Sequence, residues 1–263
     1  MNNYLLSVED LTMQFGGLKA VENVSFNLSK NQILAIIGPN GAGKTTIFNI
    51  ITGIYKPTNG IIKYKNDIIN GLSSHSIARI GIRRTFQISR LFNNLTVLDN
   101  VILGMASKQK SSLFDAVIRR NFIKKELYLN IEKALELIGY FSLDLKSKAY
   151  IKASELSQGD KRRLEICRAL ASDPEVLLLD EPSAGMDPEE TKELMVDIRK
   201  IKDRQKDIGI ILIEHDMSVV KNIADYVIVL SYGKLIAEGI FDEVSSLKIV
   251  QEAYLGKRKY SWD

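Results

Sequence analysis

The feature that most constrains this chain is the glycine-rich string Gly38–Thr46, GPNGAGKTT, which matches the pattern G-x-x-x-x-G-K-[S/T]. The apolar run Ile33–Ile37 precedes it, and the helical pattern Thr45–Ile51 follows. Glycines in such a turn let successive backbone N–H groups point inward around an anion, where larger side chains would clash. The helix N-terminus adds its partial positive charge to the same place. The string therefore predicts a loop that holds the phosphates of a nucleotide.

Two side chains of this loop are expected to add contacts to those of the backbone N–H groups. Lys44 is expected to reach the β- and γ-phosphate oxygens of a triphosphate, and the Thr45 hydroxyl is expected to ligate Mg²⁺. A glycine turn without a ligand is the alternative, and the order of strand, loop, Lys-Thr pair and helix disfavours it. GTPases, kinases, helicases and transport ATPases share such a loop, so other residues must decide the class. The nucleotide-contacting residues predicted here are Gly38, Pro39, Asn40, Gly41, Ala42, Gly43, Lys44, Thr45 and Thr46.

The later part of the chain alternates helical patterns with short apolar runs. The predicted order is helix 157–172, strand Val176–Asp180, helix 188–204, strand Gly209–Glu214, helix 216–223 and strand Val227–Leu230. Such alternation is typical of a parallel sheet with helices on both faces. Residues 4–37 instead show short strands separated by turn residues. We therefore expect an α/β fold with a mostly parallel core sheet and an N-terminal antiparallel β part.

A third region, beginning near Thr96, has a helical character. Ser112–Asp115 resembles a capping box, and Phe114, Ile118 and Phe122 recur at four-residue spacing. This pattern predicts a mostly helical subdomain. The expected division is a single nucleotide-binding domain, 1–263, comprising a core of 1–95 and 155–240, a helical subdomain of 96–154 and a C-terminal extension of 241–263.

Composition excludes several classes of protein. Lys and Arg number 36 against 32 Asp and Glu, and the net charge of +4 is too small to argue for nucleic acid or lipid as a partner. The single cysteine, Cys167, excludes an intramolecular disulfide framework and a multi-cysteine zinc site. The N-terminus lacks the pattern of a secretory signal, and no apolar run approaches the roughly twenty residues that span a bilayer. We expect a cytoplasmic protein that reaches a membrane only by docking onto something else.

An acidic pair, Asp180 and Glu181, follows four apolar residues of a predicted buried strand. At the carboxyl edge of a parallel sheet, an Asp can hold the Mg²⁺ of a bound nucleotide. Because neighbouring side chains diverge at a strand end, Glu181 can instead face an attacking water as a general base. An isolated Asp-Glu pair is usually a solvated turn, and the apolar strand before this pair disfavours that role.

A second helix N-terminus follows Leu156, where the chain continues Ser157-Gln158-Gly159-Asp160. A serine cap and a glycine offer a hydroxyl and free N–H groups to a phosphate. Taken alone, an ordinary serine N-cap is the preferred interpretation.

Together these strings resemble the nucleotide-binding subunit of ABC (ATP-binding cassette) transporters, over about residues 6–239. The signature helix of that family begins LSGGQ, and this chain has LSQGD, so that Ser157 and Gly159 match while Gln158 and Asp160 depart. The resemblance implies the P-loop NTPase fold of ABC ATPases. It also implies that Ser157 and Gly159 contact ATP held by a facing subunit.

The resemblance assigns further roles. Phe15 matches the aromatic residue that stacks on adenine, Gln87 the glutamine that contacts Mg²⁺ or water, and His215 the switch histidine near the γ-phosphate. Ser183–Asp187 matches the loop that touches the opposing subunit. Taken singly, each residue has a competing interpretation: Phe15 as a core residue, Gln87 as a surface residue and His215 as a structural residue. The implied catalytic residues are Glu181, His215 and Gln87, and the implied metal ligands are Thr45, Gln87 and Asp180.

Longer strings, among them FGGLKAVENVSF and RRLEICRALASDPEVLLLDEPSAGMDPEET, are similar to the ATPase subunit of branched-chain amino acid importers. The helical segment of roughly 104–135 is similar to that group as well. The resemblance implies ATP and Mg²⁺ as cofactors. The implied partners are transmembrane permease subunits, a second identical or different ABC ATPase subunit and, indirectly, an extracytoplasmic solute-binding protein, with no nucleic acid. The implied location is peripheral, at the cytoplasmic face of the plasma (inner) membrane.

Two alternatives stay open at this point, and a third, a P-loop kinase or GTPase, is disfavoured. The ATPase of a lipopolysaccharide-type exporter shares much of the motif set but has a shorter helical segment. A soluble ABC ATPase without a permease, such as one for iron–sulfur assembly, is similar in length. An ordinary P-loop kinase or GTPase lacks the signature helix, and no Asn-Lys-x-Asp guanine-specificity string occurs in this chain.

Overall fold

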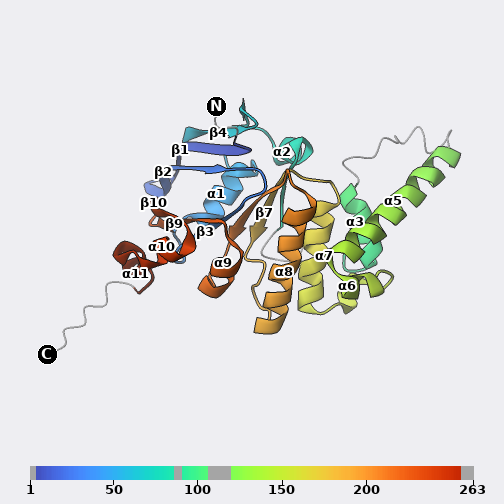
Figure 1. Cartoon of the computed structure of the whole chain (residues 1–263). Helices are drawn as coiled ribbons and strands as arrows, with labels where there is room; N and C mark the ends of the chain where they lie inside the picture. Colours follow the sequence, from blue (N-terminus) through green and yellow to red (C-terminus); the bar gives the residue numbers. More distant parts are fainter. Residues whose placement is uncertain (1–3, 86–90, 106–119, 256–263) are drawn as a thin grey trace. The chain divides into compact units, whose positions relative to one another are not determined.

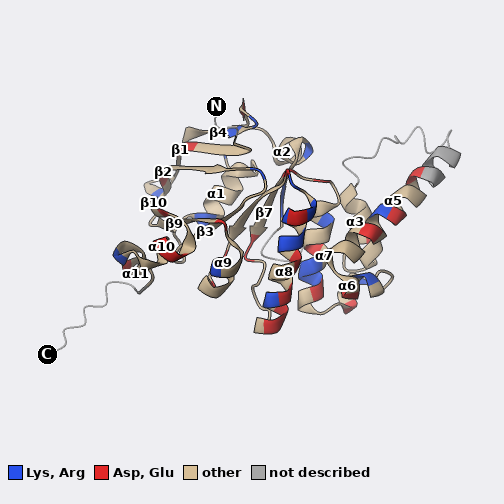
Figure 2. Ribbon diagram, viewed as in Figure 1, with Lys and Arg blue, Asp and Glu red and all other residues tan. Residues whose placement is uncertain are grey.

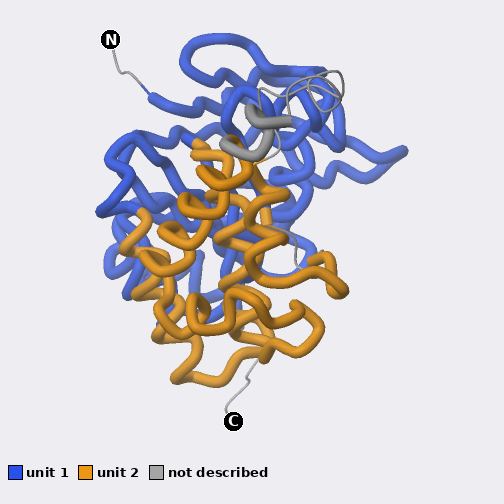
Figure 3. Tube along the Cα trace, turned by 90° about the vertical axis from the view of Figure 1, so that its right-hand side faces the viewer, with its two compact units in different colours: residues 1–84, 175–182, 202–263 blue, residues 85–174, 183–201 orange. Residues whose placement is uncertain are grey.

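The computed structural model describes residues 4–85, 91–105 and 120–255. The chain forms two compact units, coloured separately in Figure 3. Unit 1 comprises residues 1–84, 175–182 and 202–263, and unit 2 comprises residues 85–174 and 183–201. The expected helical subdomain, 96–154, lies within unit 2, which also includes the segments on either side of it and 183–201.

Unit 1 contains an antiparallel sheet near the N-terminus, as predicted. Its strands are β1 (Leu6–Phe15), β2 (Leu18–Leu28), β4 (Asn59–Tyr64) and β5 (Asp67–Ile68), in the order β2-β1-β4-β5. In the first half of β1 the residues alternate between buried and more exposed, because an antiparallel sheet covers its core on one face.

The second sheet of unit 1 carries the elements on which the site is built (Figure 1). Its order is β10 (Lys234–Gly239), β9 (Tyr226–Ser231), β3 (Ile33–Ile37), β8 (Gly209–Ile213), β7 (Val176–Asp180) and β6 (Ile82–Arg84). All neighbours pair in parallel except β10, which pairs antiparallel with β9. Every residue of β3, β7 and β8 is buried, as expected of parallel strands covered on both faces. Their carboxyl ends consequently meet at one edge.

Side chains of β3 alternate between two cores because successive residues of a strand point to opposite faces. Leu34 and Ile36 pack with the antiparallel sheet and with α1 (Lys44–Ile51). Ala35 and Ile37 pack in a second cluster with residues that include Val220 of α9 (Met217–Ile223), Val244 of α10 (Phe241–Ser246) and Val250 of α11 (Lys248–Leu255). The remaining helix of unit 1 is α2 (Ser74–Ile80), which begins after the serine cap Ser73.

Unit 2 is helical in its described residues. Its elements are α3 (Val97–Gly104), α5 (Arg120–Phe141), α6 (Leu143–Ser147), the short 3₁₀ turn Ala153–Glu155, α7 (Gln158–Leu170) and the greater part of α8 (Pro188–Arg204). A capping box formed by Thr96 and Asp99 starts α3. The expected capping box at Ser112–Asp115, with Phe114 and Ile118, lies outside the described residues, as does the side chain of Phe122.

Several predicted elements match the structure closely. The predicted strands Ile33–Ile37 and Val176–Asp180 and the predicted helix 188–204 have the bounds that the structure gives. Cys167 is buried inside α7, in keeping with a small apolar core residue. Throughout 4–85, 91–105 and 120–255, none of the helices combines the length and apolar character needed to cross a bilayer.

Candidate nucleotide-binding site

The phosphate loop leaves the end of β3 and turns sharply into α1. Gly38 and Gly43 have φ angles of +147° and +102°, which side-chain-bearing residues rarely adopt. A Cβ at Gly38 would collide with the carbonyl oxygen of Leu230, and one at Gly43 would lie 2.5 Å from the carbonyl oxygen of Ala20. The loop is therefore pressed against the surrounding backbone, and glycine is required at both positions.

The N-terminus of α1 is arranged to receive an anion. The helix begins at Lys44, and the residue before it, Gly43, supplies no side chain to cap the first N–H groups. No acidic residue occurs in the first turn of α1 either. The partial positive charge of this helix end is consequently available to a negatively charged ligand.

Lys44 is buried inside the loop. Its Nζ donates to the carbonyl oxygens of Gly38 at 2.7 Å and Pro39 at 3.1 Å. Burial lowers the pKa of Lys44, and the carboxylates of Glu181 and Asp180 oppose that effect. The ammonium group is therefore held at the base of the loop by two backbone carbonyls.

A cavity of about 310 Å³ opens over the loop in unit 1. It brings together nine of the predicted site residues: Asn40, Gly41, Ala42, Gly43, Lys44, Thr45, Thr46, Glu181 and His215. Five further residues line the cavity and were not predicted from the sequence: Leu18, Lys19, Ala20, Tyr232 and Gly233. The signal available in the sequence was their position beside glycines: Leu18 follows Gly16-Gly17, and Tyr232 precedes Gly233.

The two carboxylates at the end of β7, Asp180 and Glu181, have different surroundings. Asp180 is 2% exposed, and its Oδ2 accepts a hydrogen bond from Nη2 of Arg84 at 2.7 Å. Glu181 lines the cavity, and its Oε1 lies 2.6 Å from Nε2 of His215. Its φ angle of +47° is unusual for a residue with a side chain. The backbone N–H of Glu181 also donates to the carbonyl of Ile213, which fixes the ends of β7 and β8 together.

Phe15, which the family resemblance singled out, is not among the described residues that line the cavity. Phe15 ends β1 and is 42% exposed, which is inconsistent with a core phenylalanine. Its ring meets that of Tyr55 edge-on, with centroids 5.3 Å apart and planes at 77°. Gln87 lies outside the described residues.

The serine-capped helix start belongs to unit 2. Ser157 is the N-cap of α7, and its Oγ accepts a hydrogen bond from the backbone N–H of Asp160 at 3.1 Å. A Cβ on Gly159 would lie 2.8 Å from Oε1 of Glu190, so only glycine fits there without displacing that carboxylate. The structure thus gives both matching signature residues a definite local role.

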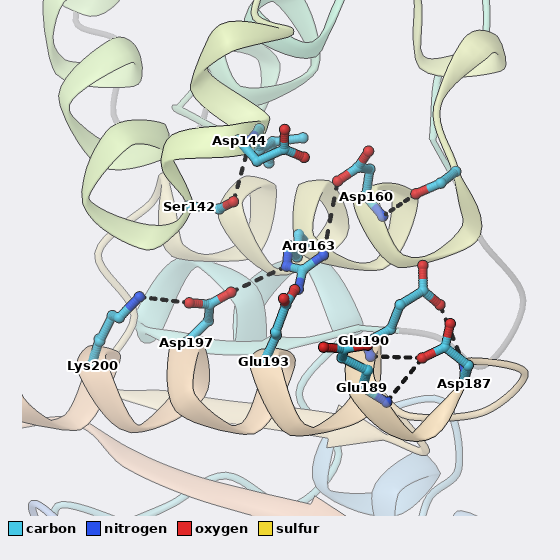
Figure 4. A network of polar contacts seen from close by, with 12 residues as sticks. Ser142, Asp144, Asp160, Arg163, Asp187, Glu189, Glu190, Glu193, Asp197 and Lys200 are labelled. Atoms are coloured by element: carbon cyan, nitrogen blue, oxygen red, sulfur yellow. Dashed lines mark hydrogen bonds and ion pairs between the residues drawn. The ribbon is translucent and has the colours of Figure 1, made fainter.

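Acidic and basic residues gather on α7 and α8 (Figure 2). Figure 4 shows part of the resulting network, in which Arg163 contacts Asp197 at 3.1 Å and Glu193 at 2.8 Å. Asp160, the residue that departs from the family signature, accepts a hydrogen bond from Nζ of Lys148 at 2.6 Å. The departure at position 160 is therefore accommodated by Lys148, the C-cap residue of α6.

The segment Ser183–Asp187 leads into α8. The Oδ1 of Asp187 accepts from the backbone N–H groups of Glu189 at 2.9 Å and Glu190 at 2.8 Å (Figure 4). Asp187 therefore satisfies N–H groups at the start of α8, as a helix-capping aspartate does.

The residues present fit a magnesium nucleotide. The backbone of the loop forms a cradle that a Cβ at Gly38 or Gly43 would disrupt, and Lys44 supplies a fixed positive charge. The hydroxyl of Thr45 and the carboxylate of Asp180 are oxygen ligands of the kind that Mg²⁺ prefers.

Comparison with known proteins agrees with this geometry. Residues 21–184 match the family model described as ABC transporter. The high-affinity branched-chain amino acid transport ATP-binding protein LivG of Escherichia coli K12 is 42% identical over 260 residues, covering 98% of this chain and 100% of that protein. The corresponding protein BraF of Pseudomonas aeruginosa is 37% identical over 259 residues, with 98% and 100% covered.

A solved structure has the same fold. The crystal structure of a nucleotide-free ATP-binding cassette from an ABC transporter superposes with a TM-score of 0.82 at 32% identity, covering 97% of this chain and 100% of that one. The chain therefore belongs to the ABC transporter family, as one of its ATP-binding cassettes.

Proposed function

We propose that this protein binds and hydrolyses ATP to power the import of branched-chain amino acids through a membrane permease. The observation that carries the catalytic part is the cavity in which the phosphate loop, Glu181 and His215 meet. The substrate class is supported by full-length similarity to proteins named for branched-chain amino acid transport. That similarity favours import over the lipopolysaccharide-exporter and soluble alternatives.

Within one subunit the phosphate loop and Lys44 hold the triphosphate, and Phe15, which is partly exposed, stacks on adenine. Thr45, Asp180 and Gln87 hold Mg²⁺, which when bound offsets charge on the phosphate oxygens. Glu181 accepts the proton of the attacking water as general base. His215 contacts the Glu181 carboxylate at 2.6 Å and so holds it in the cavity.

A second cassette completes the site in this proposal. A triphosphate carries several negative charges, and the loop of one subunit neutralises only part of them. The Ser157 hydroxyl and the N–H groups near Gly159, from the facing subunit, supply a second positive helix end. Because that contribution is gained only on closure, ATP binding draws the two subunits together and loss of the γ-phosphate releases them.

The remaining partners follow from this cycle. Permease subunits receive the motion of the cassettes, and an extracytoplasmic solute-binding protein delivers the amino acid. The subunit itself is then peripheral, at the cytoplasmic face of the plasma (inner) membrane.

Uptake of radiolabelled leucine tests the proposal in the source organism. Deletion of the gene is expected to abolish high-affinity leucine uptake, with restoration by the wild-type gene but not by Glu181→Gln. Unchanged uptake of leucine, isoleucine and valine in the deletion strain would contradict the proposed substrate class. A purified wild-type protein that releases no phosphate from ATP in complex with its permease would contradict the enzymatic part.

A further inference from the structure

Arg84, the last residue of β6, lies at a junction of unit 1 that the family motifs do not include. Its side chain is 5% exposed and points into the space between α1 and the end of β7. Nη2 donates to Oδ2 of Asp180 at 2.7 Å, and Nη1 donates to Oδ1 of Asn49 at 2.6 Å. The guanidinium also lies over the ring of Phe48, 5.3 Å from its centroid.

This arrangement connects three elements through one planar group. Asn49 and Phe48 belong to α1, the helix that starts at the phosphate loop. Asp180 ends β7, and Arg84 ends β6, which pairs in parallel with β7. Because the guanidinium fork is rigid, its two bonds fix the Asp180 carboxylate relative to the phosphate-loop helix.

The contact uses one oxygen of the Asp180 carboxylate. Arg84 donates to Oδ2, whereas no described residue makes a hydrogen bond or ion pair with Oδ1. An aspartate at 2% exposure needs such a cation, since an isolated buried carboxylate is costly. A carboxylate held through one oxygen can present the other in a fixed direction.

We propose that Arg84 is a positioning residue for the metal of the nucleotide site. Its guanidinium binds both the Asp180 carboxylate and Asn49 of α1, and so fixes the orientation of that carboxylate relative to the phosphate-loop helix. This inference rests on the proposed function, since it concerns the Mg²⁺ that accompanies ATP. In this role Arg84 acts on the metal through Asp180 and is not itself a ligand. A lysine at this place keeps the charge but cannot make both bonds in one plane.

The test compares ATP binding with and without Mg²⁺, in the full-length protein, by titration calorimetry. The measured quantity is the ratio of the ATP dissociation constant in EDTA to that in excess Mg²⁺. Removing a group that orients a metal ligand typically weakens metal affinity by about tenfold or more. Arg84→Lys is therefore expected to lower the ratio by about tenfold. The dissociation constant in EDTA should stay at the wild-type value, because the loop and Lys44 are untouched.

Two further variants sharpen the result. Asn49→Ala removes the second anchor of the fork while leaving the Arg84–Asp180 pair, and it should lower the same ratio by a smaller factor. Arg79→Lys, at an exposed position of α2, is the matched control and should leave the ratio unchanged. If thermal unfolding shows that Arg84→Lys does not fold, the ratio measured for Asn49→Ala decides the inference in its place: a lowered ratio supports it, and a wild-type ratio overturns it.

The possible outcomes distinguish a failure of the inference about Arg84 from a failure of the proposed function. A wild-type ratio in folded Arg84→Lys, even with a lowered Tm, would overturn the inference, because a merely structural role changes stability without changing the effect of Mg²⁺. A wild-type protein that binds ATP in neither condition would overturn the proposed function itself. A lowered ratio in Arg84→Lys and Asn49→Ala, with Arg79→Lys unaffected, is the result expected.

Discussion

Glu181 and His215 lie close together in the cavity at the phosphate loop, from the ends of two adjacent parallel strands. Both were named from sequence, Glu181 because it follows a buried strand and His215 because of the family resemblance. Their contact at 2.6 Å could not be inferred from sequence, since it depends on which strands are neighbours. The contact of Arg84 with Asp180 could not be inferred either, because the two residues are distant in the chain and β6, which carries Arg84, has only three residues.

Glu181→Gln is expected to abolish hydrolysis while ATP binding remains. The amide keeps the shape and hydrogen-bonding capacity of the side chain but cannot accept the proton of water. Loss of a general base typically slows a reaction by about a hundredfold or more. Phosphate release measured beside nucleotide binding checks this, and phosphate release at the wild-type rate would remove Glu181 from the base role.

Lys44→Ala should weaken MgATP binding strongly. The substitution removes a buried ammonium at the base of the phosphate loop, and a hydrogen bond to a charged group contributes about 1.5–3 kcal/mol, or roughly tenfold to a hundredfold in affinity. Lys56→Ala, at an exposed position after α1, is the control and should bind as the wild type does. Retained affinity for MgATP in Lys44→Ala would contradict the assigned loop.

At the scale of elements, the sequence predicted best where hydrophobic patterns were long or bounded by clear signals. The alternation of strands and helices after Ser157 and the loop before α1 are confirmed. The elements α2, β6, β10, α10 and α11 were not predicted. They have three to eight residues each, so they contain little periodicity, and β6 and β10 exist because β7 and β9 offer edges to pair with.

The ion pairs that Asp197 of α8 makes should stabilise unit 2 unequally, because one joins α8 to α7 and the other lies within α8. Arg163 is 8% exposed, whereas Lys200, which pairs with the same Asp197, is 43% exposed. Removing one member of a buried pair typically costs about 3–5 kcal/mol, while an exposed pair contributes about 0–1 kcal/mol. Arg163→Met is therefore expected to lower the free energy of unfolding in urea by about 3 kcal/mol, and Lys200→Met by less than about 1 kcal/mol. Equal losses would contradict this ranking.

At the scale of the whole molecule, the predicted site residues belong to two compact units. The phosphate loop, Asp180, Glu181 and His215 lie in unit 1, and Ser157 and Gly159 lie in unit 2. The motif order in the sequence sufficed to name both groups. The sequence could not supply the boundary between the units, because most of α8 belongs to unit 2 through contacts distant in the chain, such as that of Arg163 with Asp197.

Ser157→Arg tests the proposed sharing of one ATP between two subunits. The larger, charged side chain replaces the cap of α7 and should prevent a facing subunit from closing on the nucleotide. Binding of ATP to the single subunit should persist, since unit 1 is unchanged, while ATPase activity should fall to background. Wild-type ATPase in this variant would argue against a shared site.

The most direct measurement of the central claim is the ATPase rate per subunit over a dilution series, with the fraction of paired subunits measured by sedimentation in the same solutions. If each ATP site is completed by the phosphate loop of one molecule and the serine-capped helix of another, the ATPase rate per subunit falls in proportion to the fraction of paired subunits. Single subunits should then show no ATPase activity. A constant rate per subunit, at dilutions where only single copies sediment, would contradict the account.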